Sequence, residues 1–576
     1  MIKLILLLFL TVSCLHCKDK NELMQVNIAN APVTVCAPQT TDTRWYETQQ
    51  AAPLFDGLGN LHYTISTSNP LIQQYFDQGL KLSYAFNHAE AARSFYYASR
   101  LDSTCAMCYW GYSYVLGPNY NAGMEPDNYE RAFDAIQKAI KWSGKSSDKE
   151  KQLILTLATR YVKDPVENRF PLDSAYSAAM KKLHQQYPED PEIAALYVES
   201  VMDLHPWDLW DKQGQPKPWT HEIVSIIERL IKKHPNHPGF HHFYIHAVEA
   251  SFQPEKGLES ARKFDQGMVP GAGHLVHMPS HIYIRTGDYH EGSIANINAV
   301  KIDSQYISSC HAQGVYPLAY YPHNYHFLAA TATLEGKKSW ALTASEKMSA
   351  HIDQELMKDP AWATLQHYYL IPYFVRVKFG DWDSILSRPE PAISLPYVQA
   401  IRHYARGMAF LNQKNISASR AEWAQLDSIA GDTTLKDLTI WAINSIADIV
   451  SLATKVLHAE ILAKESSFDQ SIRLLREAVA LEDQLAYNEP PDWFFSVRHH
   501  LGAVLIEAGK NEEAIKTYQE DLVRLPKNGW AHHGLKTAYQ NIQDIKAVSE
   551  IDKDLLQSWK HAEVQLSASR IDLQVN

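Results

Sequence analysis

Residues 502–526, GAVLIEAGKNEEAIKTYQEDLVRLP, decide how this chain folds. Apolar residues recur with helical period on both sides of a glycine, Gly509. Small residues, Gly502 and Ala514, occupy one position in each half, and larger ones such as Tyr518 fill the positions between them. Two antiparallel helices approach closely only where small residues face large ones. The stretch therefore predicts a tightly packed helical hairpin.

The spacing of these residues resembles that of the tetratricopeptide repeat (TPR) family. Its markers stand here as Leu501, Gly502, Leu505, Gly509, Ala514, Tyr518 and Pro526. Other stretches carry the same glycines and alanines, at Gly79, Ala91, Ala132, Gly287, Gly336 and Gly380. The resemblance covers roughly residues 70–560 and implies an all-α, right-handed α-solenoid of about a dozen TPR-like helix pairs. It implies little about activity, because TPR proteins mostly bind peptides and proteins through varied surfaces.

The chain as a whole also resembles large bacterial TPR-repeat proteins with a lipoprotein-type signal. Its 576 residues divide into four predicted segments. These are a signal peptide at 1–17, a tether with an irregular lead-in at 18–70, a TPR-like solenoid with a histidine-lined groove at 71–400, and C-terminal TPR-like repeats at 401–576. Loops rich in Pro, Trp, Tyr and Gly interrupt the repeats near 117–130, 205–220 and 306–321. Such insertions commonly carry function on a repeat scaffold, and here they either roof a cavity or pack under long loops.

The first residues, MIKLILLLFLTVSCLHC, are typical of a targeting signal. The apolar run from Leu4 to Val12 is shorter than the roughly 20 residues of a membrane-spanning helix. Ser13 directly before Cys14 resembles a bacterial lipoprotein cleavage box, although Thr11 replaces the usual aliphatic residue. We expect an extracytoplasmic protein, in the periplasm or at the cell surface, that contacts the membrane only through a lipid on Cys14. The alternative is secretion with a later cut.

Cysteine spacing leaves several pairings open among Cys36, Cys105, Cys108 and Cys310. The C-x-x-C motif at 105–108 is followed by Tyr109, so it is not a c-type haem attachment site. In an oxidising compartment we expect a disulfide, within the pair or to Cys36. Metal ligation by the pair is the alternative.

Histidines concentrate in one interval: 12 of the 27 fall between residues 234 and 326. In TPR proteins, positions 2, 5, 9 and 12 of each repeat point into the concave groove, because they form one helical stripe. Numbering three successive repeats from their own markers puts histidine at position 5 in each and at position 9 in two: His242, His277 and His326, then His246 and His281. His274 and His323 fall at position 2, and His274 precedes the helix proper, where it caps or lines a loop. Glu249 falls at position 12.

These five groove histidines predict a transition-metal site. First helices of neighbouring repeats pack about 8–10 Å apart, so their imidazoles converge within reach of one ion. Confined neutral imidazoles each need a partner, and an unsatisfied buried polar group costs about 1–3 kcal/mol. A divalent ion uses the lone pairs, and an imidazole-rich donor set suits Zn, Cu, Fe or Ni. Glu249 is expected as a further ligand or as an orienter of His246. The alternative is a polar groove for an acidic peptide.

Two functions therefore remain open. The first is an exported module whose groove binds a protein, peptide or small molecule, with a metal at its centre. The second is a metal-dependent hydrolase or oxidoreductase inside the solenoid, with Glu249 as the general base. The H-E-x-x-H, Walker, G-x-S-x-G and dinucleotide motifs do not occur in the sequence. The net charge of −11 and the lack of a Lys/Arg cluster argue against nucleic-acid binding.

Overall fold

The computed structural model describes residues 42–310 and 314–570. The predicted signal segment 1–17, the predicted lipidation site Cys14, and Cys36 lie outside the described residues. Among the residues that are described, no helix combines the length and the apolar character needed to cross a bilayer.

The hairpin predicted at 502–526 forms as helices α23 (Arg498–Glu507) and α24 (Asn511–Arg524). Gly509 makes the turn between them with a φ of 74°, a left-handed conformation that favours glycine. The two helices touch at Gly502, where an added Cβ would overlap the ring of Tyr518. The small-against-large pattern therefore has the packing role that the sequence predicted.

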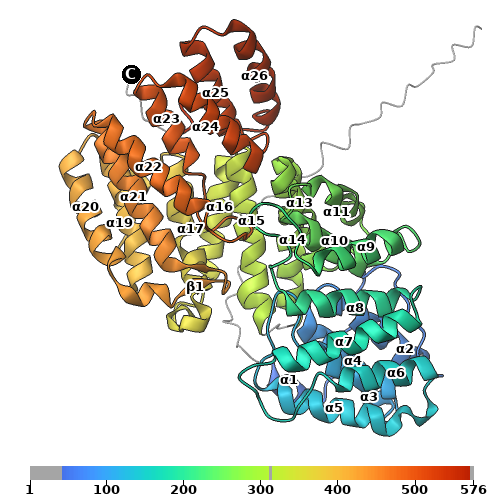
Figure 1. Cartoon of the computed structure of the whole chain (residues 1–576). Helices are drawn as coiled ribbons and strands as arrows, with labels where there is room; N and C mark the ends of the chain where they lie inside the picture. The colour runs from blue at the N-terminus through green and yellow to red at the C-terminus, as the bar shows by residue number, and fades with distance from the viewer. Residues whose placement is uncertain (1–41, 311–313, 571–576) are drawn as a thin grey trace, which may run out of the picture.

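Helix pairs of this kind make up the described chain (Figure 1). The N-terminal helices are α1 (Thr43–Glu47), α2 (Pro70–Ser83), α3 (His88–Leu101), α4 (Ala106–Val115), α5 (Asn128–Trp142), α6 (Asp148–Ala158), α7 (Phe170–Gln186), α8 (Pro191–Leu204) and α9 (Thr220–Ile231). The central helices are α10 (Pro238–Glu249), α11 (Leu258–Asp265), α12 (Gly273–His277), α13 (Pro279–Thr286), α14 (Tyr289–Cys310), α15 (Tyr321–Leu334), α16 (Lys338–His351), α17 (Thr364–Lys378) and α18 (Trp382–Ser387). The C-terminal helices besides α23 and α24 are α19 (Pro396–Asn412), α20 (Ile416–Ala430), α21 (Ile446–Lys464), α22 (Phe468–Glu482), α25 (Gly529–Asn541) and α26 (Ile545–Ser558).

The other regular elements are short. A π-helical turn, Tyr316–Tyr320, leads into α15, and 3₁₀ turns occupy Ser143–Lys145, Pro254–Gly257, Leu356–Lys358, Pro360–Trp362 and Thr433–Lys436. Strands β1 (Thr439–Ile440) and β2 (Asn444–Ser445) pair antiparallel. The chain is an all-α solenoid of TPR-like helix pairs, so the predicted fold class is confirmed.

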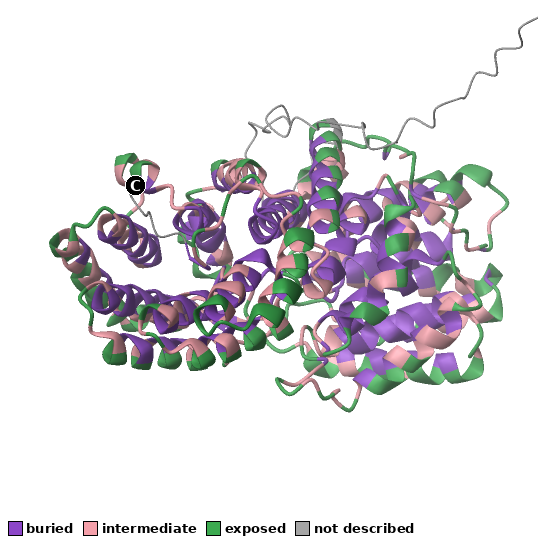
Figure 2. Cartoon of the chain, turned by 90° about the horizontal axis from the view of Figure 1, so that it is seen from above, coloured by how far each residue is buried: buried purple, intermediate pink, exposed green. Residues whose placement is uncertain are grey.

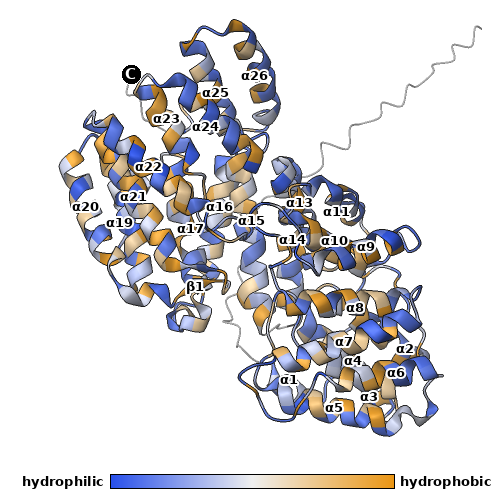
Figure 3. Cartoon of the chain, viewed as in Figure 1, coloured by the Kyte–Doolittle hydropathy of each residue, from blue (hydrophilic) through white to orange (hydrophobic). Residues whose placement is uncertain are grey.

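Apolar side chains form two cores along this array. One gathers buried residues mainly from 52–283, and the other gathers residues from 284–551. Buried residues line the faces where neighbouring helices meet, and exposed residues collect at helix ends and outer faces (Figure 2). The helices differ in how far they are buried. Helices α10 and α15 are buried at every position, whereas α26 buries Ile551 alone and carries both polar and apolar residues along its length (Figure 3). The cores part near residue 284, and the boundary at 400 stays a prediction.

The C-terminal repeats return to the centre of the chain. The turn after α13 contacts the turn between α24 and α25: Tyr289 donates to Pro526 O at 2.7 Å, and Lys527 Nζ lies 2.8 Å from Asp288 Oδ1. This return places the loop 483–497, between α22 and α23, beside α13. Residues more than 200 positions apart therefore meet at the centre.

The C-x-x-C motif closes on itself. Cys105 and Cys108 form a disulfide at the start of α4, one of the two pairings expected for an oxidising compartment. Cys310 ends α14.

Candidate metal centre

Six histidines gather where the central helices meet. They are His242 and His246 on α10, His274 and His277 on α12, His281 on α13, and His323 on α15. Each is at most 9% exposed. The break between α12 and α13 does not disturb their spacing, because Met278 keeps helical dihedrals (φ −51°, ψ −34°) and Pro279 begins the next helix.

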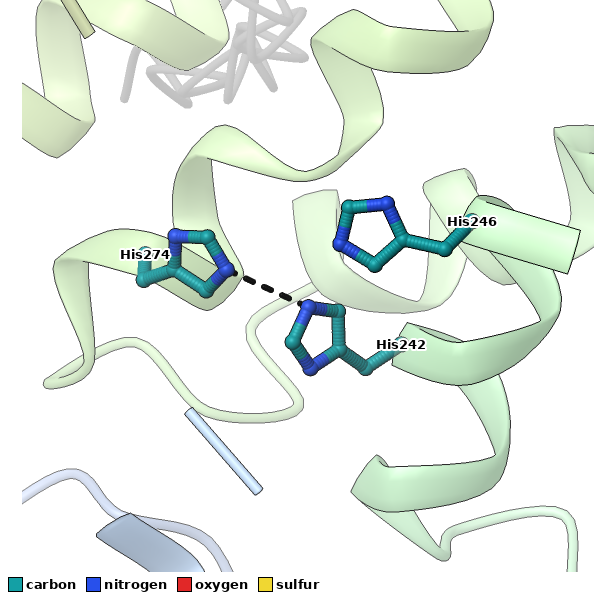
Figure 4. Close-up of side chains that lie close together, drawn as sticks. All are labelled: His242, His246 and His274. Atoms are coloured by element: carbon teal, nitrogen blue, oxygen red, sulfur yellow. Dashed lines mark hydrogen bonds between the residues drawn. The ribbon is translucent and has the colours of Figure 1, made fainter. Parts of the chain in front are cut away.

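His242, His246 and His274 form the first trio. One ring nitrogen of each lies within 4.8 Å of those of the other two. His242 Nε2 and His274 Nε2 are 3.2 Å apart, and the ring centroids of His242 and His246 are 4.9 Å apart. Figure 4 shows these three rings turned toward one another, His242 and His246 from α10 and His274 from α12. Phe86 packs against His242 with 4.4 Å between ring centroids and closes one side of the trio.

His277, His281 and His323 form the second trio, again with one ring nitrogen each within 4.8 Å. His277 Nε2 and His281 Nε2 are 2.9 Å apart, and the ring centroids of His277 and His323 are 5.0 Å apart. Phe327, one turn after His323 on α15, lies against all three rings at 4.6–5.0 Å. Each trio therefore has an apolar wall of its own.

Hydrogen bonds decide which nitrogen faces the centre of the first trio. His242 Nδ1 lies 2.7 Å from the carbonyl oxygen of Tyr84, and His246 Nδ1 lies 2.8 Å from Glu249 Oε1. Both partners only accept, so each Nδ1 carries the proton and each Nε2 holds a lone pair when the ring is neutral. A partner that fixes the distal nitrogen in this way is typical of metal-ligating histidine.

The second trio repeats the pattern. His277 Nδ1 lies 2.8 Å from Asn296 Oδ1, whose amide nitrogen already donates to Gly292 O. His281 Nδ1 lies 2.6 Å from Glu249 Oε2. Four of the six imidazoles thus have Nδ1 against an oxygen acceptor, three through hydrogen bonds and His281 through an ion-pair contact. When these rings are neutral, their Nε2 atoms are the inward-facing lone-pair atoms.

Two buried carboxylates serve this cluster. Glu249 contacts His246 with one oxygen and His281 with the other. Glu489, from the 483–497 loop, lies 3.1 Å from His281 Nδ1 and 4.0 Å from Arg285 Nε. Burial raises the pKa of Glu489 to about 7, whereas the contacts of Glu249 with His281 and His246 outweigh its burial and lower its pKa.

Burial holds most of the cluster in the neutral form. It lowers the pKa of His242, His274, His277 and His323 well below 6.5. Burial acts in the same direction on His281, but Glu249 and Glu489 outweigh it and raise its pKa to about 9. Without a metal, a protonated His281 can donate from Nε2 to His277 Nε2 in the second trio. His246 Nε2, in the first trio, is buried without a hydrogen-bond partner.

A cavity of about 350 Å³ adjoins the second trio. His323 and Glu489 form part of its wall. Its aromatic lining comes from the insertions and from the C-terminal half, namely Tyr120, Trp207, Tyr320 and Trp441. The predicted insertions therefore border a cavity at the histidine cluster, and this is the size of a small-molecule site.

The structure brings together four of the five histidines proposed as metal ligands: His242, His246, His277 and His281. His326 lies apart from both trios. Residues three apart on α15 differ by about 60° around the helix axis, so His323 faces α12 and α13 while His326 faces α17. There its ring lies 5.5 Å from that of His367 and 5.4 Å from that of Phe494.

Sequence reasoning missed His274 and His323 as cluster members, and it missed Glu489. His274 precedes His277 by three residues, and His323 holds a groove position, so both had a signal in the helical spacing. Glu489 had none, because it follows α22 in an irregular loop.

No protein-family model matches the chain, and no curated protein matches it. Solved structures similar to it include the human IFIT1 dimer with m7Gppp-AAAA, at 11% identity and a TM-score of 0.33, covering 88% of this chain and 96% of that one. The Cut9–Hcn1 hetero-tetramer of the APC/C matches at 10% identity and a TM-score of 0.29, covering 90% and 79%. The TPR domain of P58(IPK) matches at 11% identity and a TM-score of 0.20, covering 82% and 98%. Scores this low carry no argument about function, and the assignment of a TPR-like solenoid rests on the helix pairs themselves.

Proposed function

We propose that this protein is a metal-dependent enzyme. Its histidine cluster binds transition-metal ions, and the ions act on a small molecule held in the adjoining cavity. One observation carries the proposal: four imidazoles have Nδ1 tied to oxygen acceptors, so their Nε2 lone pairs point into a buried interior. A cation is the partner that satisfies several such lone pairs together.

A metal accounts for the cluster better than a polar groove does. A groove for an acidic peptide needs cationic or donating side chains at its surface, but five of the six imidazoles are at most 1% exposed. Burial also disfavours their protonation. The donor set of imidazoles suits Zn, Cu, Fe or Ni.

The cavity favours an enzyme over a purely structural metal site. Three protein ligands leave a coordination position for water or substrate, whereas structural sites are closed by four. His323 belongs to a trio and also lines the cavity, so an ion there is next to the space a substrate would fill. The ion decides whether the reaction is hydrolytic or redox.

Glu249 is better suited to orient ligands than to act as the predicted general base. Both of its oxygens lie against imidazole Nδ1 atoms, and its side chain is 1% exposed. A general base needs an oxygen within reach of substrate. Glu489, which lines the cavity, is in a better position to exchange protons with a bound molecule.

The compartment is part of the proposal. The leader at 1–17 and Cys14 support export and a lipid anchor, and the Cys105–Cys108 disulfide suits an oxidising compartment.

Elemental analysis of the purified mature protein tests the metal. We expect at least one transition-metal ion per chain in the wild type and only trace metal in the double variant His246→Ala with His281→Ala. His221→Ala removes an exposed histidine on α9 and serves as the control, which should keep wild-type metal. Equal trace metal in the wild type and the double variant would contradict the proposal that the cluster binds metal.

Azide binding tests whether the metal has an open coordination position, as the proposed enzyme requires. Protein loaded with Co(II) should change its visible absorption when azide is added, because an open coordination position accepts the anion. A visible spectrum that azide does not change would indicate a closed structural site.

A further inference from the structure

The cluster divides into two sites. We infer that each trio takes one copper ion, so that the protein holds a pair of copper ions beside the cavity. This inference rests on the proposed function and specifies its metal and stoichiometry.

The two trios share no ligand atom. The first consists of His242, His246 and His274, and the second of His277, His281 and His323. Both ions can therefore be bound together, each by three imidazoles.

Glu249 lies between the two sites. It also forms a third group of ligand atoms with His246 and His281. That group uses the Nδ1 side of both rings, and an ion there would break the two contacts that orient them. We therefore assign Glu249 as a positioning residue that directs Nε2 of His246 into one site and Nε2 of His281 into the other.

The sites are adjacent. Across the boundary between the trios, the ring centroids of His246 and His281 are 5.3 Å apart, and those of His274 and His277 are 5.8 Å apart. Among residues 42–310 and 314–570, neither trio has a fourth histidine, cysteine or carboxylate atom within the same reach, so each ion would keep a free position. A pair of ions this close offers two contacts to one small molecule.

Charge selects copper among the metals that imidazole suits. Six neutral imidazoles contribute no charge. The charged groups in contact with them are Glu249 and Glu489, and Arg285 lies against Glu489; these three sum to −1 when all are ionised. Two divalent ions would leave +3 in a buried site, whereas two univalent ions would leave +1. An uncompensated buried charge is costly, and copper has a stable univalent state that zinc, nickel and iron lack. Divalent copper also binds nitrogen donors most tightly in its series.

Anaerobic titration with Cu(I), followed by removal of loose metal and elemental analysis, tests the inference. We expect about two copper ions per wild-type chain. His274→Asn and His323→Asn should each lose one ion and keep the other, because each removes a ligand from one trio. His326→Asn is the matched control: it removes a buried histidine from the same helix as His323 and should keep both ions.

The outcomes separate this inference from the proposed function. One copper per wild-type chain, or loss of both ions in each single variant, would overturn the two-site inference and leave a metal site intact. Two zinc ions with no tight copper would overturn the choice of metal. No tight metal of either kind would overturn both proposals. Circular dichroism of each variant establishes that it is folded, and the wild-type stoichiometry decides the question if a variant is not.

Discussion

Buried histidines occur in two regions of this protein, and their partners differ. In the C-terminal repeats, His499 lies 2.9 Å from Asp521 through Nε2 and 2.9 Å from Lys378 Nζ through Nδ1, while His500 pairs with Glu460. In the central cluster the imidazoles face one another instead. Burial of histidine is common to both regions, so burial alone does not mark a metal site. The central cluster is distinguished by Nε2 atoms that converge while Nδ1 is held from outside, which is the arrangement that the proposed metal site requires.

The largest expected effect is a loss of folding stability when a histidine of the C-terminal region is replaced. His499→Ala removes a partner of the buried Asp521 carboxylate and of the buried Lys378 amine. Leaving a buried charge without its partner costs about 3–5 kcal/mol, so we expect the free energy of unfolding in urea to fall by about that amount.

Metal content supplies the contrast for His499→Ala. The folded variant should keep wild-type metal, because His499 belongs to neither trio. Loss of metal, or a destabilisation below about 1 kcal/mol, would mean that the two regions are not distinct in the way we describe.

The next effect concerns orientation within the cluster. Glu249→Gln keeps one acceptor oxygen but places an N–H group where the second oxygen stood, so only one of His246 and His281 keeps its partner. Loss of such a partner weakens metal binding by about 10–100-fold. Competition with a chelator of known affinity measures the change. Unchanged affinity would show that Glu249 does not orient the ligands.

The smallest effect is a pH dependence of stability that comes from Lys378, the partner of His499. Burial lowers the pKa of Lys378 from 10.5 to about 7. Between these values the unfolded lysine binds a proton that the folded one does not, so stability should rise as pH increases from 7 toward 9. Lys378→Met removes this titration, and its stability should rise less than that of the wild type over the same range. Chemical denaturation at several pH values checks the difference, and parallel curves would contradict it.

Much of the fold was predictable from sequence because TPR-like packing is local. Gly502 and Tyr518 meet within one hairpin, and Gly509 needs only its own φ to make the turn. Four of the clustered histidines were predictable for the same reason: His242 and His246, like His277 and His281, are one helical turn apart.

The choice between His323 and His326 was not predictable at that level. Both lie on one helix and both hold groove positions of the repeat. Which of them faces α12 and α13 depends on the rotation of α15 against its neighbours, and packing between helices sets this rotation.

The sequence by itself determined the repeat, the helix faces and the concentration of imidazoles in the middle of the chain, because helical period and short-range packing are written in neighbouring residues. Only the tertiary structure decided that the imidazoles separate into two trios, that Glu249 stands between them, and that Glu489 reaches His281 from more than 200 residues away. Those contacts depend on how far the solenoid turns before its C-terminal repeats meet α13, and that geometry accumulates over many helix pairs.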